Sequence, residues 1–334
     1  MTNNECVTAI IVVRNAEDHI KNAINSILEQ TFGLEKMELI LVDGQSTDNT
    51  INIIKEVLLK DERINKLIDV KLLTNEKKIL SSGWNMAIRE SKCPYVIRID
   101  AHSEINEDYI SGCFDNFKEN NDISCVGGTL NTININKKRD YISMILSSPF
   151  GVGNSKFRYS DKKEFVDTVA YGLYKKDEII KNGYFNEKLK RNQDTFLHSK
   201  IRDNGGLFLL DPSITANYYA RESILKMSKQ AFRNGYWNVK TLLINKKAFV
   251  LRHFIPLFYV LSLVFLIPMI FLSKVFLYFL IAQESLYLLS SVYFAFKKTK
   301  NIIKVLKMII GFKILHLSYG IGSLLSFFTK KIKI

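Results

Sequence analysis

The fold of this chain is decided by the stretch Leu39-Ile40-Leu41-Val42-Asp43-Gly44-Gln45-Ser46-Thr47-Asp48-Asn49-Thr50. Its first four residues are apolar, which is typical of a strand buried on both faces of a sheet. The strand ends in Asp43, and Ser46-Thr47-Asp48 can cap the helix that the pattern of residues 49–59 predicts. Open α/β sheets bind ligands at the carboxyl ends of their strands, so Asp43 is a candidate for hydrogen bonds to a ribose or a base.

Strands and helices alternate on both sides of this stretch. Expected strands cover residues 7–13, 37–42, 70–73, 95–99, 125–130 and 166–174, and expected helices cover residues 17–30, 49–59, 79–90, 108–118, 176–182 and 195–203. This alternation predicts an α/β fold with a mostly parallel sheet and helices on both faces. The side chains expected at the carboxyl edge of the sheet are Arg14, Asn15, Asp43, Thr74, Asp100 and His102.

The net charge of +14 is confined to the C-terminal third of the chain. Residues 1–220 hold 29 Lys and Arg against 31 Asp and Glu, whereas residues 221–334 hold 18 against 2. The basic part is also the most apolar part. This combination indicates contact with an anionic membrane surface, so we expect a membrane partner and no nucleic acid.

Two long apolar runs predict a helical hairpin in the membrane. Residues 254–273 contain no charge and residues 275–296 contain only Glu284, and each run could cross a hydrocarbon core of about 30 Å at about 1.5 Å per residue. The lysines between residues 297 and 307 predict, by the positive-inside rule, that both ends of the hairpin are cytoplasmic. A third apolar segment, residues 308–328, is interrupted by one lysine and three glycines. We expect it to lie in the interface or to re-enter the membrane without spanning it.

The cysteines and glycines exclude several common sites. Four cysteines in 334 residues, without CxxC spacing, are too few for a disulfide framework and do not form a zinc motif. We therefore expect a reducing compartment. The chain contains neither GxGxxG after the first strand nor GxxxxGK[ST], so classical dinucleotide and P-loop sites are not supported.

The triplet Asp100-Ala101-His102 ends the fourth expected strand. Side chains two residues apart in an extended chain point to the same side. This Asp and His can therefore offer an oxygen and a nitrogen ligand to a divalent ion that bridges a diphosphate. The same spacing also fits a simple turn at the end of a strand, so the triplet alone leaves both interpretations open.

Several elements follow one another in the order and spacing of glycosyltransferase family 2. They are residues 7–15, the DGQSTDNT element at 43–50, the GWNMA element at 83–87, the RIDAH element at 98–102 and Asn192-Gln193-Asp194. Over residues 6–245 the chain resembles these inverting enzymes, whose GT-A fold is a Rossmann-like sheet with helices on both faces. It is most similar to the succinoglycan-type bacterial polysaccharide transferases, which also carry Asp-Ala-His in place of Asp-x-Asp and have a C-terminal membrane region.

This resemblance implies a role for each matching residue. The residues implied to bind a nucleotide-sugar, with a UDP-sugar as the expected donor, are Val13, Arg14, Asn15, Asp43, Asn85 and Asp100. Asp100 and His102 would hold a divalent metal, Mn²⁺ or Mg²⁺. Asp194 would be the general base that deprotonates the acceptor hydroxyl.

The chain departs from the family pattern at two places. Gln193 precedes Asp194 where the family usually has a glutamate, which leaves Asp194 as the only carboxylate for this task. Gln193, Arg158, Arg233 and Trp237 would be acceptor or loop residues. Arg233 and Trp237 match an Arg-Trp signature of many relatives only loosely, and an interfacial helix with Trp at the headgroup level explains them equally well.

The sequence therefore predicts a membrane-anchored, metal-dependent glycosyltransferase that acts on a lipid-linked saccharide in capsule or exopolysaccharide synthesis. Two alternatives stay open: a transferase that acts directly on polyprenyl phosphate, and a non-catalytic sugar-nucleotide-binding membrane subunit. We expect a GT-A domain over residues 1–220, a basic interfacial helical region over 221–253 and a membrane region over 254–334. The expected location is the inner or plasma membrane, with the catalytic domain in the cytoplasm.

Overall fold

The computed structural model describes residues 5–134, 137–245 and 251–329. The chain forms two compact units, which are treated separately below. The first comprises Met1–Asn131 and Ser160–Tyr218, and the second comprises Thr132–Tyr159 and Tyr219–Ile334. Residues 132–159 are thus grouped with the C-terminal part of the chain, whereas the domain boundaries at residues 220 and 253 stay predictions.

A single mixed sheet organises the first unit, and its strands run in the order β3-β2-β1-β4-β8-β6-β9-β5, with β7 beside β9. Four strands are parallel: β1 (Val7–Val13), β2 (Met37–Asp43), β3 (Asp69–Thr74) and β4 (Tyr95–Asp100). The other strands are β5 (Ser103–Ile105), β6 (Ile123–Ile133), β7 (Glu164–Phe165), β8 (Leu173–Lys175) and β9 (Leu207–Tyr219). Strand β8 is antiparallel to β4 and to β6, so the sheet is parallel only in its N-terminal half.

The sequence predicts the parallel half well and the antiparallel half less well. All residues of β1 and β2 are buried, as expected for strands covered on both faces. The expected strand over residues 166–174 is wrong, because only Leu173–Lys175 is extended in the sheet. The 13-residue β9 was not expected, and Asp211-Pro212 within it hides its pattern.

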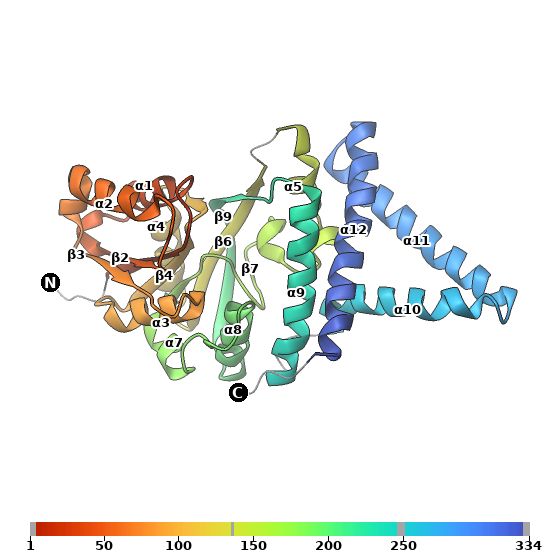
Figure 1. The fold of residues 1–334 in the computed structure, drawn as a ribbon. Coiled ribbons are helices and arrows are strands. Elements are labelled where there is room, and N and C mark those ends of the chain that lie inside the picture. The colour runs from red at the N-terminus through yellow and green to blue at the C-terminus, as the bar shows by residue number, and fades with distance from the viewer. Residues whose placement is uncertain (1–4, 135–136, 246–250, 330–334) are drawn as a thin grey trace. The chain divides into compact units, whose positions relative to one another are not determined.

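Helices cover both faces of the parallel strands (Figure 1). They are α1 (Ile20–Leu28), α2 (Thr50–Lys60), α3 (Leu80–Glu90), α4 (Tyr109–Glu119), α7 (Lys176–Lys181) and α8 (Gln193–Asp203). Helix α3 packs closely on β1 because residue 83 is glycine. A Cβ at Gly83 would lie 2.6 Å from Cγ1 of Val12, which is closer than side chains tolerate.

One cysteine pair departs from the expectation for a reducing compartment. Cys6 and Cys93 form a disulfide although 87 residues separate them, and Cys113 and Cys125 are free and buried. The parallel pairing of β1 with β4 brings the two residues together, since Cys6 is one residue before β1 and Cys93 is two residues before β4. No local spacing motif could reveal this pair, because it depends on strand order.

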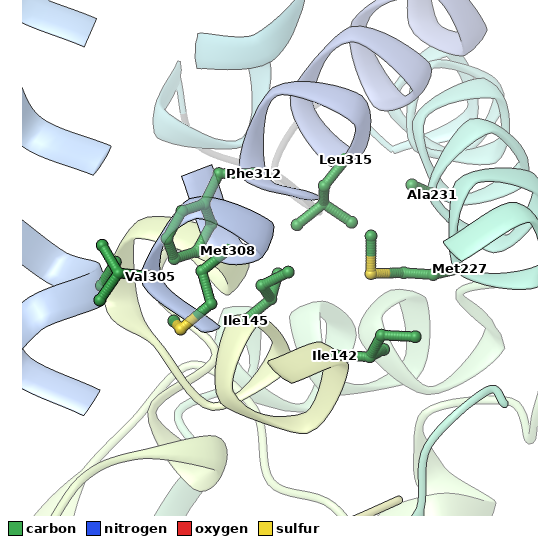
Figure 2. Close-up of a cluster of buried hydrophobic side chains, with 9 residues drawn as sticks. Ile142, Ile145, Met227, Ala231, Val305, Met308, Phe312 and Leu315 are labelled. Carbon is green, nitrogen blue, oxygen red and sulfur yellow. The ribbon is translucent and has the colours of Figure 1, made fainter. Parts of the chain in front are cut away.

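The second unit is helical. It contains α5 (Tyr141–Leu146), α6 (Pro149–Val152), α9 (Ile224–Ile244), α10 (Ile255–Met269), α11 (Lys274–Lys298) and α12 (Ile302–Phe327). Helices α9 and α12 lie side by side (Figure 1). Figure 2 shows how α5, α9 and α12 share one core, in which Ile145, Met227 and Phe312 are almost fully buried.

The apolar helices differ from the predicted hairpin in length. Helix α10 has only 15 residues, or about 22 Å at the usual rise, because the apolar residues after Met269 form a turn and Ser273 caps α11 by accepting from the N–H of Val275. Helices α11 and α12 are long and apolar enough to cross a membrane. The three glycines of the third segment do not interrupt α12, which is continuous.

Candidate active site

The carboxyl ends of the parallel strands lie in register. Val13 of β1 pairs with Asp43 of β2, and Asp43 pairs with Thr74 of β3. On the other side of β1, Val12 pairs with Asp100 of β4. The loops after β1, β2 and β4 therefore leave the sheet at one edge, as expected for a ligand site of an α/β sheet.

Asn15 joins the loops that follow β1 and β2. Its Oδ1 accepts from the N–H of Thr47 at 2.8 Å, and its own N–H donates to Oγ of Ser46 at 3.0 Å. Asn15 and Gln45 both have left-handed backbone conformations, with φ of 52° and 59°. Asn tolerates this region better than most residues, so Asn15 suits the turn as well as the hydrogen bonds.

The Asp43 carboxylate stabilises the same turn. It accepts a hydrogen bond from Oγ of Ser46 at 2.6 Å and from the N–H of Ser46 at 3.1 Å, and the residue is 6% exposed. A carboxylate offers about four acceptor sites, so these bonds leave capacity for a ligand. Val13 is buried and its carbonyl accepts from the N–H of Gly44 at 2.8 Å, whereas Arg14 is exposed.

Asp100 ends a strand, and His102 lies in the short turn that connects it to the next strand. Strand β4 ends at Asp100 and β5 begins at Ser103. Both residues are partly exposed, and the His102 ring lies edge-on to Tyr218 with 5.9 Å between ring centroids. The sequence predicts extended chain for this pair, whereas residues 101 and 102 form a turn, and the role of the pair as metal ligands stays a prediction.

Asp194 lies in the first turn of α8 and contacts a buried arginine of the sheet. Its Oδ2 is 3.4 Å from Nη2 of Arg98, and its Oδ1 accepts from the N–H of Thr195 at 2.8 Å. The Asp194 side chain is 36% exposed, but that of Arg98 is only 9% exposed. Asn192 begins the helix in a left-handed conformation, with φ of 60°. Arg98 and the N–H of Thr195 therefore fix the Asp194 carboxylate, while part of this side chain remains accessible to solvent.

Arg98 contributes to the ionisation of Asp194. Burial acts to raise the pKa of the Asp194 carboxyl, but the charge of Arg98, the nearby His198 and the hydrogen bond from the N–H of Thr195 together lower the pKa. One turn along α8, burial lowers the pKa of His198 to about 3. His198 is fully buried and hydrogen-bonded to Thr168 at 2.7 Å and to Tyr174 at 2.6 Å. At neutral pH the site thus contains an ionised Asp194 beside a neutral imidazole.

Two predicted site residues are buried and engaged in structural contacts. Asn85 is 2% exposed; its Nδ2 donates to the carbonyl of Phe185 at 2.8 Å and its Oδ1 accepts from the N–H of Phe185 at 3.0 Å. Gln193 is 5% exposed and donates to the carbonyl of Leu189 at 2.9 Å. The amide of Asn85 thus fixes the loop at Phe185, and its role in nucleotide binding stays a prediction. Gln193 likewise fixes the turn before Asp194.

Three predicted residues belong to the second unit. Nη1 of Arg158 lies 3.5 Å from Oγ1 of Thr132, and the guanidinium contacts the ring of Phe157. Arg233 and Trp237 are on α9, where Arg233 is exposed and Trp237 is partly buried. Their predicted role toward the acceptor stays a prediction.

Arg98 is the residue that sequence reasoning missed. Its guanidinium lies 4.0 Å from the centroid of the Trp84 ring and 5.6 Å from that of Phe185, so the cation stacks on aromatic faces inside the protein. A signal was present in the sequence: Arg98 lies between Ile97 and Ile99 in a strand, and an arginine in this setting needs a partner when it is buried.

Known proteins resemble this chain in sequence. Residues 8–180 match the family described as Glycosyl transferase family 2. The dolichyl N-acetyl-alpha-D-glucosaminyl phosphate 3-beta-D-2,3-diacetamido-2,3-dideoxy-beta-D-glucuronosyltransferase of Methanococcus voltae is 29% identical over 77% of this chain and 81% of its own length. Succinoglycan biosynthesis protein ExoA of Rhizobium meliloti is 24% identical over 74% of this chain and 73% of its own length.

Solved structures share the fold. The mannosyltransferase PcManGT of Pyrobaculum calidifontis, in complex with GDP-Man and Mn²⁺, superposes with a TM-score of 0.67 over 95% of this chain and 86% of its own, at 14% identity. S. aureus TarS 1-349 in complex with UDP gives a TM-score of 0.50 at 19% identity, over 68% of this chain and 64% of its own. With the family match over residues 8–180, the chain belongs to glycosyltransferase family 2 and is a glycosyltransferase of the GT-A fold.

Proposed function

We propose that this glycosyltransferase inverts the anomeric carbon as it moves a sugar from a nucleotide-sugar to a lipid-linked saccharide at a membrane, with Asp194 as the general base. The observation that carries the proposal is the Asp194–Arg98 pair. An ionised carboxylate that is fixed by a buried cation, yet 36% exposed, can accept a proton from an incoming hydroxyl.

The proposed donor site is the edge formed by the loops after β1, β2 and β4. Asp43 has acceptor capacity for a ribose or a base, and Asn15 holds its loop in place through Thr47 and Ser46. Arg14 is exposed at the same edge and can pair with a phosphate. Asn85 acts only indirectly, by fixing the loop at Phe185. A UDP-sugar is the proposed donor, in line with the TarS complexes with UDP and UDP-GlcNAc.

Asp100 and His102 are the proposed ligands of a divalent cation that is shared with the donor. Among the described residues, no group of three or more His, Cys, Asp and Glu side chains could hold a metal ion. Two protein ligands would therefore be completed by diphosphate oxygens and water, which is a common arrangement for ions that accompany phosphates. An imidazole ligand suits Mn²⁺ better than Mg²⁺. When bound, the ion would neutralise charge on the leaving diphosphate.

The proposed reaction is a direct displacement. Asp194 takes the proton of the acceptor hydroxyl while that oxygen forms a bond to the anomeric carbon. The bond from this carbon to the diphosphate oxygen breaks, and its electron pair leaves with the nucleoside diphosphate. The new bond forms on the face opposite the leaving group, so the configuration inverts. Arg98 stays protonated throughout, and it keeps Asp194 ionised and oriented before the acceptor arrives.

A lipid-linked acceptor explains the second unit. Large apolar side chains such as Phe271 and Tyr278 are 89% and 67% exposed, and exposed apolar surface of this extent is typical of membrane contact. The Methanococcus voltae relative carries a dolichyl phosphate-linked sugar in its name, and ExoA is a succinoglycan biosynthesis protein. We therefore propose a role in capsule or exopolysaccharide assembly, with the catalytic unit on the cytoplasmic side of the inner or plasma membrane.

A donor screen with purified membranes tests the proposed function. Release of nucleoside diphosphate is measured for a set of UDP-, GDP- and dTDP-sugars with extracted lipids as acceptors. We expect one donor to be turned over, and Asp194→Asn to lower turnover about 10²–10⁴-fold while donor binding persists, since the side chain is almost isosteric. Wild-type turnover in this variant would refute the role of Asp194. Donor binding without any turnover would favour the non-catalytic alternative.

A further inference from the structure

A groove between α9 and α12 has the dimensions of a ligand site. Its volume is about 340 Å³, within the usual range of small-molecule pockets. Four residues of α9 and two of α12 line it: Ser228, Lys229, Phe232, Arg233, Ser318 and Ile321. All of them belong to the helical second unit.

Close backbone contacts fix the walls of this groove. A Cβ at Gly235 would lie 2.0 Å from the carbonyl oxygen of Tyr319, and one at Gly322 would lie 2.1 Å from that of Phe232. The two helices thus touch through glycines beside the groove, and larger side chains would separate them. The hydroxyls of Ser228 and Ser318 lie 2.8 Å apart and connect the helices at the groove itself. The groove is therefore a preformed feature of the helix pair.

The lining combines positive charge with apolar surface. Lys229 and Arg233 are exposed and four residues apart on α9, so they share one face of the helix and repel one another unless an anion lies between them. No acidic residue is among the six described residues of the lining. Phe232 and Ile321 add apolar surface beside the two cations, and Ile321 is 42% exposed.

We propose that this groove binds the phosphate of the lipid acceptor, with Lys229 and Arg233 on the phosphate oxygens and the first part of the lipid chain against Phe232 and Ile321. A lysine and an arginine suit a phosphate, because they supply several charged donors at once. An anionic head on an apolar chain matches both halves of the lining. This inference rests on the proposed function, since it names the group by which that acceptor is held.

A binding experiment with farnesyl phosphate tests the groove. The full chain is placed in nanodiscs of phosphatidylcholine, and the affinity for farnesyl phosphate is compared with that for farnesol, inorganic phosphate and phosphatidic acid. We expect farnesyl phosphate to bind most tightly. Lys229→Gln and Arg233→Gln should each weaken it about tenfold, and Arg233→Lys should restore part of the loss. The matched control is Lys226→Gln, which removes the same charge from α9 outside the groove, where Lys226 pairs with Glu222.

Each other outcome overturns the inference. Unchanged affinity for farnesyl phosphate in the double variant Lys229→Gln/Arg233→Gln would show that the groove does not bind it. An equal loss of affinity in Lys226→Gln would show that general surface charge, and not the groove, attracts the ligand. Equal binding of phosphatidic acid would indicate a phospholipid headgroup site, and equal binding of inorganic phosphate would indicate a free phosphate site. Binding of UDP and release of nucleoside diphosphate are measured in parallel. If a donor is turned over but farnesyl phosphate does not bind in the groove, only this inference is overturned. If farnesyl phosphate binds in the groove but no donor is turned over, the proposed function is overturned.

Discussion

Nη2 of Arg98, on strand β4, lies 3.4 Å from Oδ2 of Asp194, in the first turn of helix α8. The contact joins two elements that are 96 residues apart in sequence. Arg98 is two residues before Asp100 on the same strand, so one buried cation links the proposed base to the strand that ends in the proposed metal ligand. Attraction to Asp194 and Asp100 favours the charged arginine, although burial acts to lower its pKa.

Replacing Arg98 is expected to shift the pH profile of the reaction. The pKa of Asp194 is lowered in the structure against the effect of burial, so the wild type should stay active at pH values below the usual titration range of an aspartate. In Arg98→Met the cation is lost while burial persists, so the pKa should rise and the acidic limb of kcat/KM should move to higher pH. Arg98→Lys, which keeps the charge, should leave the limb close to that of the wild type.

The measurement is kcat/KM from pH 4 to pH 8 for the three proteins, with UDP binding as the control for folding. An acidic limb at the same pH in Arg98→Met and in the wild type would show that Arg98 does not set the ionisation of Asp194. Loss of UDP binding in Arg98→Met but not in Arg98→Lys would show instead that the cation supports the fold around Trp84.

The three carboxylates of the proposed site are candidates from the sequence because each follows a local pattern. Asp43 and Asp100 end apolar strands, and Asp194 stands in a short motif. Arg98 could not be paired in this way, because its partner lies on another element. Cys6 and Cys93 were missed for the same reason. Strand order and the packing of helix on sheet decide these contacts, and neither is encoded in local periodicity.

The apolar C-terminal helices show the same limit. Apolar composition indicates helices between residues 254 and 296, but it does not distinguish a helix from the turn that follows Met269. Glu284 is the one charge in the apolar run 275–296, and Lys313 is the one charge in the run 308–328. Their meaning is clear only in the structure, where Nζ of Lys313 donates to Oε2 of Glu284. Pairing between distant helices is again what the sequence leaves open.

Activity should require a divalent cation. We expect EDTA to abolish transfer and Mn²⁺ to restore it better than Mg²⁺, because His102 offers an imidazole nitrogen. His102→Asp should shift the preference toward Mg²⁺. The readouts are transfer activity and UDP binding as each metal is titrated, so that metal affinity and turnover are separated. Full activity and unchanged UDP binding in EDTA would exclude a metal role for Asp100 and His102.

We propose that α12 does not span the membrane. It packs along α9, whose exposed Lys229 and Arg233 favour an aqueous or headgroup environment. Nζ of the buried Lys240 on α9 donates to the carbonyl oxygens of Ser326, in the last turn of α12, and of Thr329, just after the helix. The helix pair therefore shares one side of the membrane, and α10 and α11 remain as the inserted hairpin. By the positive-inside rule, the lysines between residues 297 and 307 predict that this side is cytoplasmic.

Thiol labelling tests this topology. Phe328 is 80% exposed, so Phe328→Cys in a variant without its own cysteines gives one accessible thiol near the end of α12. We expect an impermeant thiol reagent to label it in inverted vesicles but not in intact cells. Labelling from outside intact cells would show that α12 spans. The control variant is Phe271→Cys. Phe271 is 89% exposed and lies in the turn between α10 and α11, at the tip of the proposed hairpin.

The pair of Glu284 and Lys313 should hold the apolar helices together. The hydroxyl of Tyr259 on α10 donates to Oε1 of Glu284 at 2.8 Å, and the Tyr259 ring stacks on Tyr287 with centroids 5.1 Å apart. Lys313 donates to both Glu284 and Tyr259, so one polar cluster connects α10, α11 and α12.

Glu284→Gln leaves Lys313 without a counter-charge among apolar helices, and it should lower the free energy of unfolding by about 1–3 kcal/mol. Lys313→Met should have a similar effect. The double variant should lose less than the sum of both, because each single change leaves the other charge unpaired. The measurement is the thermal midpoint of unfolding of the wild type, the two single variants and the double variant in one detergent. Lys307→Met is the control on α12, because Lys307 contacts the Tyr141 ring and takes no part in the cluster. Additive losses would show that the two charges stabilise the helices independently.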